Sequence, residues 1–336
     1  MKAAVIDAPG KLAVRDVPSP VPAPGEVIVS LALGGLCGTD LHIFAGELNY
    51  GYPIIAGHEV VGTIAEIGEG VFDLDVGMRV AFDPNIACGS CHYCQKMRFN
   101  HCLHWEGIGV TRDGGFAERV AVPASVIYPI GNMPFDQAVF IEPLSCVVYG
   151  LQRATPSLGD KVLILGAGPI GLLLMQSVRR AGAASVVITD VQRDRLDLAS
   201  RLGAEAAMQA GDGQRDALFD LAPYGYDMVI DATGAPAVAA SAFDYVTRGG
   251  KVLLFGVCPE DATIPFSPFK IYRHDISVYG SFALNKSFGP AIELLKSGAV
   301  QVGDLISHRF SLDRFPAALE LALSRSEPTM KILIEP

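Results

Sequence analysis

The sequence predicts an α/β protein of two domains, one rich in β-strands and one built on a doubly wound parallel sheet. Three observations carry this prediction: four cysteines within residues 88–102, a glycine-rich turn at residues 166–171, and a change of pattern near residue 150. Before residue 150, short apolar segments follow one another, whereas after it apolar segments alternate with helical patterns. The two parts of the chain should therefore differ in architecture.

Length and composition limit the class of protein. The chain has 336 residues, half of them hydrophobic and 18% charged, which suits two globular domains with separate cores. The net charge is −10 and no run of Lys or Arg stands out, so we expect no nucleic acid partner. The most apolar stretch, Val162–Met175, is short and interrupted by glycines, so we expect no membrane span. The seven cysteines suit reduced thiols or thiolate ligands, so we expect a cytoplasmic protein.

The first 150 residues should form short strands separated by Gly, Pro and Asp signals. Alternate prolines at residues 18–24 predict an extended connector that turns into a strand at Gly25 and Glu26. The expected strands are Val27–Leu33, Val60–Ile67, Arg79–Phe82 and Phe116–Val122.

The following section should form a parallel sheet covered by helices, because strands and helical patterns alternate there. The expected elements are strands Lys161–Leu165, Ser185–Thr189, Met228–Asp231, Lys251–Phe255 and Ile276–Tyr279, and helices Ile170–Ala181 and Arg193–Leu202. After a further helix at Gly289–Ser297, the chain ends in an apolar strand, Lys331–Ile334. We expect this last strand to rejoin the first domain.

Cys88, Cys91, Cys94 and Cys102 have a spacing typical of a zinc site. Four thiolates close the tetrahedral coordination of zinc and leave no position for a substrate, so this zinc should be structural. Two disulfides are the alternative, but they suit a small secreted domain rather than this chain.

The glycine-rich turn predicts a dinucleotide site. Gly166, Gly168 and Gly171 fit the G-x-G-x-x-G pattern, which Pro169 and Ile170 complete, between an apolar strand and a helix. The glycines permit a tight turn, close approach of a pyrophosphate, and close packing of helix on strand, while the helix N-terminus attracts the phosphates.

The residue at the end of the next strand bears on the choice of dinucleotide. Asp190 stands 19 residues beyond Gly171, where a carboxylate accepts hydrogen bonds from ribose hydroxyls and repels a 2′-phosphate. This favours NAD. The alternatives are that Asp190 only caps the following helix, or that Arg193 and Arg195 assist the phosphate of NADP. Arg195 can also stack on the adenine.

A second group of residues has the chemistry of a catalytic zinc site. Cys37, His58 and Glu59 supply a thiolate, an imidazole and a carboxylate, and Glu142 is a further acidic candidate just before the predicted parallel sheet. Thr39 and His42 follow Cys37 closely and can carry a proton from a bound alcohol to water. Taken alone, Cys37 and His58 are ordinary core residues; their occurrence with the cysteine lobe and the glycine turn favours zinc.

This joint pattern resembles the zinc-dependent medium-chain alcohol and polyol dehydrogenases over essentially the whole chain. The shared motifs are Gly57-His58-Glu59 with Val61-Gly62, the four-cysteine lobe, Asp113-Gly114-Gly115-Phe116-Ala117-Glu118, and the glycine turn, all in the family's order. The resemblance implies a GroES-like catalytic domain (residues 1–148 and 284–336) around a Rossmann domain (residues 149–283) that binds NAD. It also implies two zinc ions per chain, one catalytic and one structural.

The resemblance also implies individual roles. Cys37 and His58 bind the catalytic zinc, Glu59 is a ligand or a close neighbour of it, and Glu142 takes a position that is glutamate in the polyol branch. Thr39 and His42 form the proton relay. The loops that touch the cofactor contain Thr233, Gly234, Gly256, Val257, Ser281 and Phe282.

The substrate is left among three alternatives. Glu142-Pro143-Leu144 is similar to the sorbitol, xylitol and arabinitol dehydrogenases, although Ala283-Leu284-Asn285 stands where sorbitol dehydrogenases carry an Arg-Tyr pair. The Cys37–His42 segment is similar to threonine 3-dehydrogenases. The third alternative is a protein that binds NAD and zinc without turnover. The resemblance further implies a homotetramer, in which a strand near Ile264–Phe266 pairs between copies.

Overall fold

The computed structural model describes residues 1–324 and 326–336. The chain forms two compact units. The first comprises Met1–Pro143, Phe288–Lys296 and Val302–Pro336, and the second comprises Leu144–Ser287 and Ser297–Gln301. The expected boundaries after residues 148 and 283 differ from these by a few residues, and the return of 297–301 to the second unit was not expected.

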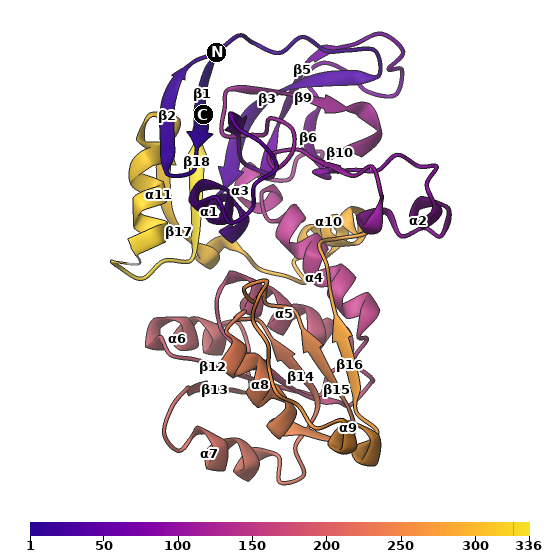
Figure 1. Cartoon of the computed structure of the whole chain (residues 1–336), viewed down its shortest axis with the longest axis vertical. Helices are drawn as coiled ribbons and strands as arrows, with labels where there is room; N and C mark the ends of the chain where they lie inside the picture. Colours follow the sequence, from indigo (N-terminus) through magenta and orange to yellow (C-terminus); the bar gives the residue numbers. More distant parts are fainter. Residues whose placement is uncertain (325) are drawn as a thin grey trace. The chain divides into compact units, whose positions relative to one another are not determined.

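The first unit is built on β-sheets (Figure 1). Its largest sheet has the order β10-β6-β5-β3-β18-β17, and β9 pairs with β3. The bounds are β3 Glu26–Gly35, β5 Glu59–Ile67, β6 Arg79–Phe82, β9 Arg119–Pro123, β10 Ile127–Pro129, β17 Ile306–Ser311 and β18 Lys331–Glu335. A smaller sheet, β2-β1-β4, comprises β1 Lys2–Ala8, β2 Lys11–Asp16 and β4 Ile54–Ile55. β7 Asn85–Ile86 pairs with β8 Glu106–Gly107.

Short helices complete this unit. They are α1 Gly38–Ala45, α2 His92–Gln95, α3 Phe135–Ala138, α10 Phe288–Lys296 and α11 Phe315–Ser324, with 3₁₀ turns η1 Phe99–His101, η2 Ala124–Val126, η3 Gly303–Leu305 and η4 Leu312–Arg314. The core includes the fully buried Phe116, whose ring lies 4.5 Å from that of Phe315 on α11, so the N- and C-terminal segments share one apolar interior.

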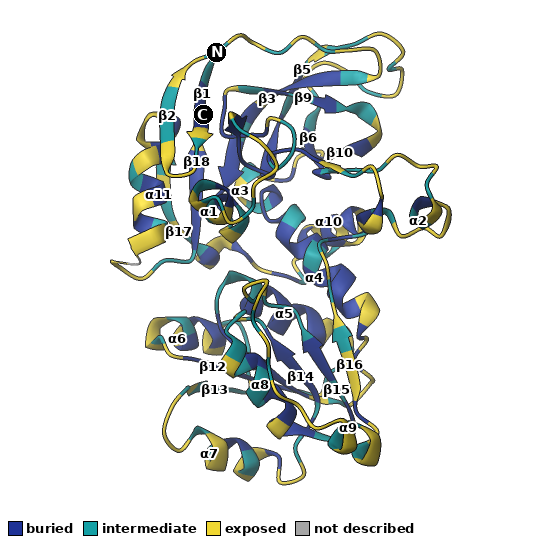
Figure 2. Ribbon diagram, in the orientation of Figure 1, coloured by how far each residue is buried: buried dark blue, intermediate teal, exposed yellow. Residues whose placement is uncertain are grey.

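The C-terminal strand confirms the expectation that the chain rejoins its first domain. β18 pairs antiparallel with β3 through Leu333 and Gly35, and parallel with β17 on its other side. Figure 2 shows the strands of this sheet mostly in the colour of buried residues. The apolar run Ile332–Ile334 is buried here, which explains why it was readable as a strand.

The second unit is a six-stranded parallel sheet in the order β13-β12-β11-β14-β15-β16. Its strands are β11 Lys161–Leu165, β12 Ser185–Asp190, β13 Ala206–Gln209, β14 Tyr226–Asp231, β15 Val246–Leu254 and β16 Ser277–Gly280. Its helices are α5 Pro169–Arg180, α6 Arg193–Arg201, α7 Gln214–Leu221, α8 Pro236–Tyr245 and α9 Pro268–His274, and α4 Ile141–Arg153 leads into it. Numbered from β11, this is the order 3-2-1-4-5-6 of the doubly wound dinucleotide fold.

These elements confirm the predicted α/β fold class and every strand expected in the parallel sheet, with ends shifted by a few residues. The strand expected near Ile264–Phe266 is wrong for this chain, because residues 262–267 have no regular secondary structure and precede α9. Among the described residues, no helix combines the length and apolarity needed to cross a membrane.

Candidate metal centres and cofactor site

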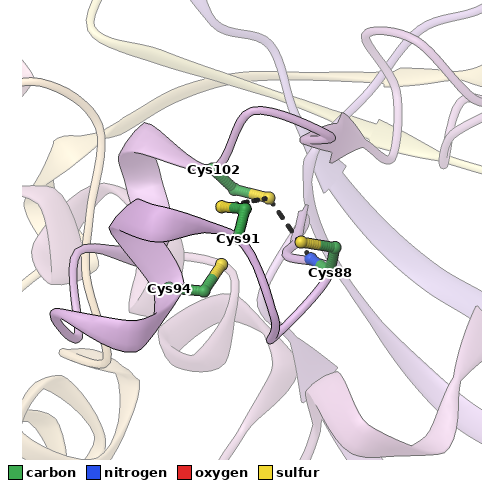
Figure 3. A group of neighbouring side chains, drawn as sticks. All are labelled: Cys88, Cys91, Cys94 and Cys102. Atoms are coloured by element: carbon green, nitrogen blue, oxygen red, sulfur yellow. Dashed lines mark hydrogen bonds between the residues drawn. The ribbon is translucent and has the colours of Figure 1, made fainter.

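The four cysteines of residues 88–102 come together. Their Sγ atoms all lie within 4.8 Å of one another, and Figure 3 shows them turned toward a common centre. The one-turn helix α2 carries Cys94 and begins after Cys91, while Cys102 follows η1. All seven cysteines of the chain are free thiols, so the disulfide alternative finds no support in this geometry.

The electrostatics of this lobe call for a cation. Hydrogen bonds from the backbone of Ser90 and Cys91 lower the pKa of Cys88 to about 6, whereas burial and the neighbouring thiols raise the pKa of Cys94 to about 12. Four sulfurs at this separation therefore do not all ionise in the bare protein. A dication at their centre stabilises four thiolates at once, so the donor set fits a closed zinc site.

Cys37, His58 and Glu59 form a second cluster, in which one donor atom of each lies within 4.8 Å of the others. Cys37 is the N-cap of α1, and Glu59 is the first residue of β5. The segment before His58 is held by the glycine-rich Asp113–Phe116 stretch: Asp113 accepts the N–H of Ile55 at 3.0 Å. Backbone bonds from residues 114–116 to residues 55–57 continue this pairing. The Gly57-His58-Glu59 motif and the Asp113–Phe116 stretch therefore depend on each other for their backbone hydrogen bonds.

Asp40 is the residue that ties this cluster together. Its carboxylate is buried and accepts the N–H of Cys37 at 2.8 Å and that of Gly57 at 3.2 Å. Its Oδ1 also lies 3.4 Å from His58 Nδ1, but the alignment gives no hydrogen bond, so this buried nitrogen has no hydrogen-bond partner among the described residues. Burial lowers the pKa of His58, but the charges of Asp40 and Cys37 together raise it by more, so the pKa lies well above its ordinary value. The cluster thus attracts positive charge, as a zinc site should.

We expect Asp40→Asn to weaken zinc binding at this cluster by about 10- to 100-fold, the usual effect of losing a carboxylate that orients a metal ligand. The isosteric amide still fits the space but loses the charge that faces His58. The measurement is a chelator competition that follows release of the more weakly held zinc. The exposed Asp136→Asn, on α3, is the matched control. An unchanged affinity in Asp40→Asn would show that Asp40 does not support the site.

Lys331 is a site residue that the sequence did not reveal. Its Nζ lies 2.5 Å from Glu59 Oε2, and both side chains are buried. Burial lowers the pKa of Lys331, but Glu59, Cys37 and Glu142 raise it more, so the ammonium stays charged. The only signal in the sequence was a lysine in an otherwise apolar terminal strand.

Glu142, Thr39 and His42 lie around the cluster rather than in it. Glu142 stands in the first turn of α4, close enough for its charge to act on Lys331, but it is not part of the three-residue cluster. Thr39 Oγ1 is 3.8 Å from Cys37 Sγ. His42 is half-exposed on α1, with Nδ1 2.5 Å from Glu47 Oε2. Thr39 and His42, three residues apart in one helix, share a face of it.

The glycine-rich turn lies between β11 and α5, beside the point where the strand order reverses between β11 and β14. In such sheets, ligands bind at this switch point, outside the carboxyl ends of the strands. Gly168 is the N-cap of α5 and Pro169 its first residue, so the helix begins as a phosphate site requires. A Cβ at Gly171 would lie 1.9 Å from the carbonyl oxygen of Gly166, so only glycine allows this packing.

Asp190 lies at the end of β12 and contacts this turn. Its Oδ2 accepts the N–H of Ala167 at 2.7 Å, and its Oδ1 accepts that of Gln192 at 2.9 Å. Arg195 Nη1 is 3.7 Å from Asp190 Oδ2. The structure therefore brings the expected ribose-binding carboxylate and Arg195 together at the glycine turn.

The remaining expected cofactor residues follow β14, β15 and β16. Thr233 donates a hydrogen bond to Asp231 at 2.6 Å, and Gly234 and Gly256 pack so closely that a Cβ at Gly256 would lie 2.1 Å from the N of Gly234. Val257 and Phe282 are 84% and 60% exposed, and Ser281 precedes Phe282 directly. Apolar side chains exposed at the carboxyl edge of a parallel sheet are consistent with a ligand that covers them.

Two family profiles match the chain. The alcohol dehydrogenase GroES-like domain matches residues 23–132, and the zinc-binding dehydrogenase domain matches residues 169–297. The first match contains both cysteine-bearing clusters but not Glu142, and the second begins within the glycine turn.

Several characterised proteins are similar over nearly their whole length. D-arabinitol dehydrogenase 1 of Uromyces fabae is 36% identical over 93% of this chain and 90% of its own. D-altritol 5-dehydrogenase of Agrobacterium fabrum is 36% identical over 90% of this chain and 88% of its own. L-threonine 3-dehydrogenase of Streptomyces coelicolor is 34% identical over 92% of each chain.

Solved structures of dehydrogenases are also similar to this chain over its whole length. A zinc-binding dehydrogenase from Sinorhizobium meliloti 1021, bound to NADP, has a TM-score of 0.93 and 35% identity over 100% of this chain and 99% of that one. An alcohol dehydrogenase from Escherichia coli CFT073, in complex with NADH, has a TM-score of 0.93 and 30% identity over the same shares.

Proposed function

The chain belongs to the zinc-dependent medium-chain alcohol and polyol dehydrogenases, and we propose that within this family it oxidises a secondary hydroxyl of a sugar alcohol with NAD⁺. The observation that carries the proposal is the cluster of Cys37, His58 and Glu59, with the charge of Glu142 close by. Carboxylate oxygens are harder Lewis bases than thiolate sulfurs, so one thiolate with two carboxylates makes a more oxygen-rich site than two thiolates would. Carboxylates can also accept hydrogen bonds from several substrate hydroxyls. The arabinitol and altritol dehydrogenases among the relatives support a polyol.

The residues of the cluster bind and orient in this proposal. Cys37 and His58 hold the zinc, and Glu59 and Glu142 are the carboxylates beside it. Asp40 positions the backbone of Cys37 and of Gly57, the residue before His58. The zinc supplies a Lewis acid that lowers the pKa of an alcohol hydroxyl, and NAD⁺ supplies the hydride acceptor. The four-cysteine lobe holds the second, structural zinc.

Thr39 and His42 form the proton path. The Thr39 hydroxyl lies beside Cys37 Sγ and takes the hydroxyl proton of the alcohol by hydrogen-bond exchange. His42, on the same face of α1 and half-exposed, passes it to water. Its contact with Glu47 holds the ring on the solvent side.

Asp190 is the residue we propose to select NAD over NADP. The structures of relatives contain either NADP or NADH, so membership of the family does not decide the cofactor. A negative charge at the ribose site repels a 2′-phosphate. We expect Asp190→Asn to reduce the preference for NAD⁺ at least about tenfold, because like-charge contacts cost several kcal/mol. The amide can still accept the N–H of Ala167.

The measurement is the ratio of kcat/KM for NAD⁺ and NADP⁺, with Asp197→Asn, an exposed position on α6, as the control. An unchanged ratio in Asp190→Asn, or a wild-type preference for NADP⁺, would contradict this role of Asp190.

The substrate class is tested by NADH formation from a panel of alcohols in zinc-replete protein. We expect turnover of xylitol, sorbitol, galactitol or an arabinitol, with a preference that identifies the hydroxyl pattern. A simple secondary alcohol should react with a lower kcat/KM, because it lacks the hydroxyls that add binding energy. Absence of turnover with every polyol would contradict the proposal.

L-threonine is the second candidate substrate. It is favoured by the Cys-Gly-Thr-Asp-x-His segment at Cys37–His42 and by the threonine 3-dehydrogenase relative. Turnover of L-threonine alone on the same panel would replace the polyol by this amino acid.

We also propose an assembly of identical chains, a homotetramer, in the cytoplasm. β16 ends the parallel sheet and is mostly exposed, and α9 beside it buries no residue. Phe269 and Tyr272 on α9 are 69% and 81% exposed, and an open strand edge is a template for pairing. Free thiols suit a reducing compartment. Sedimentation that gives a monomer at micromolar concentration would refute the assembly.

A further inference from the structure

A buried cation lies beside the carboxylate of the proposed catalytic site. Lys331 begins β18, and its Nζ lies 2.5 Å from Glu59 Oε2. Their side chains are 7% and 2% exposed. A metal ion and an ammonium group that share one carboxylate compete for it, and water screens this competition little in a buried site.

The contact between Lys331 and Glu59 depends on a glycine in the strand that lies between them. β3 lies between β5 and β18, and Gly35 of β3 pairs with Glu59 on one side and with Leu333 on the other. A Cβ at Gly35 would lie 2.3 Å from Glu59 Oε2. The missing side chain therefore lets the Glu59 carboxylate pass over β3 and reach Lys331.

The ammonium is fixed at this place. Besides Glu59, it donates to the carbonyl oxygen of Leu36, the residue after β3, at 3.4 Å. The charges of Cys37 and Glu142 also act on the ammonium, so it interacts electrostatically with three anionic groups of the site. Without the lysine, a bound metal ion would no longer share the attraction of these anionic groups with a neighbouring ammonium.

We propose that Lys331 is a positioning residue that keeps Glu59 an exchangeable ligand of the catalytic metal, so that the site retains an open position. The inference rests on the proposed function, because it requires a metal at Cys37 and His58. A carboxylate whose oxygen is held by an ammonium donates more weakly to a metal. Catalytic zinc sites keep three protein ligands and one open position. With Cys37, His58 and Glu142 as the three ligands of the proposed site, a permanent bond from Glu59 would be the fourth and would close the open position.

The alternative is that the pair only stabilises the fold. Buried ion pairs are weak evidence for stability, and a supporting neighbour of a metal ligand normally raises metal affinity. The two roles therefore predict opposite signs. If Lys331 competes with the metal, its loss tightens metal binding; if it supports the site, its loss weakens binding.

The experiment uses the full chain with cobalt(II) exchanged into the Cys37–His58 site while the four-cysteine lobe keeps zinc, as metal analysis verifies. Chelator competition measures cobalt affinity. Imidazole, added as a small exogenous ligand, reports the open position through the visible absorption of cobalt. Wild-type protein is compared with Lys331→Met, Glu59→Gln and the double variant, and with Lys296→Met, a surface lysine in an ion pair, as the control.

We expect Lys331→Met to bind cobalt about tenfold more tightly and imidazole about tenfold more weakly, within the range by which neighbours of metal ligands act. In the Glu59→Gln background, the loss of Lys331 should leave imidazole affinity unchanged. Gly35→Ala should act like Lys331→Met although it keeps the charge, since its methyl group obstructs the passage of the carboxylate. Lys331→Arg should restore wild-type behaviour.

Weaker or unchanged cobalt binding in Lys331→Met, or imidazole affinity that falls equally without Glu59, would overturn the inference. If Lys331→Met does not fold, Lys331→Gln and Gly35→Ala decide the question by the same two affinities. Failure of the proposed function would look different: the wild-type protein would then bind neither cobalt at Cys37 nor imidazole.

Discussion

Replacing Cys37 by Ser is expected to lower the turnover number about a thousandfold or more, because the Lewis acid of this reaction supplies several kcal/mol of transition-state stabilisation. Cys37 contributes the only sulfur of the three-residue cluster, and serine does not supply a thiolate. The fold should persist, since Cys37 is only a half-buried N-cap residue whose backbone N–H bonds to Asp40.

The measurement combines kcat for the best polyol with the zinc content of the purified variant. Cys146→Ser, which removes a half-buried cysteine outside both metal clusters, is the matched control and should keep one catalytic and one structural zinc. A Cys37→Ser protein that loses the catalytic zinc and still turns over at a near-normal rate would refute the assignment of this cluster as the catalytic centre.

Replacing Cys94 by Ser should instead act on stability. Cys94 and Cys102 are the two buried thiols of the four-cysteine lobe, and burial raises the pKa of Cys94 to about 12 in the bare protein. A zinc bound to all four sulfurs would link α2 to the segment that follows η1. Structural zinc contributes folding free energy directly. We expect the melting temperature to fall by more than about 10 °C, with one zinc lost per chain.

Thermal melting with metal analysis tests this expectation, and Gln95→Ala, an exposed neighbour on α2, is the control. The cobalt spectrum of the Cys37–His58 site and the activity of the remaining folded protein should be retained. Loss of the lobe's zinc with an unchanged melting temperature would show that the lobe has no structural role.

The parallel sheet was predictable because its signals are local. Lys161–Leu165 is a continuous apolar run before a glycine turn, and the structure places β11 over the same residues. The central strands β11, β12 and β14 are buried over most of their length, so their apolar composition marks them. The terminal strand was predictable for the same reason.

The strand expected at Ile264–Phe266 is wrong because a segment of three residues with a proline at its centre carries little information. Pro265 cannot donate to a ladder, and the segment precedes Pro268 at the start of α9. The helix α1 was not expected either, although it positions Thr39 and His42, because Gly38 and Thr39 are poor helix formers and its N-cap is a cysteine.

The candidate metal ligands could be named from residue type and spacing, and the structure brings Cys37, His58 and Glu59 together, but the charges around them could not be predicted. Asp40 lies within the Cys37–His42 segment, so its place near the site was implicit, yet its bonds to Cys37 and Gly57 exist only in the folded chain. Lys331 is 272 residues from Glu59 in sequence, and no local pattern connects them. Only the sheet order β5-β3-β18 brings the two together.

The central claim is that the zinc held by Cys37 and His58 drives the oxidation of a polyol. The most direct test is the rate of NADH formation from the best polyol as zinc is removed from that site by a chelator and then restored. We predict that the rate vanishes with the metal and returns in proportion to one equivalent of zinc per chain, while the four-cysteine lobe stays loaded. A rate that persists after the Cys37–His58 site has been emptied would contradict the account.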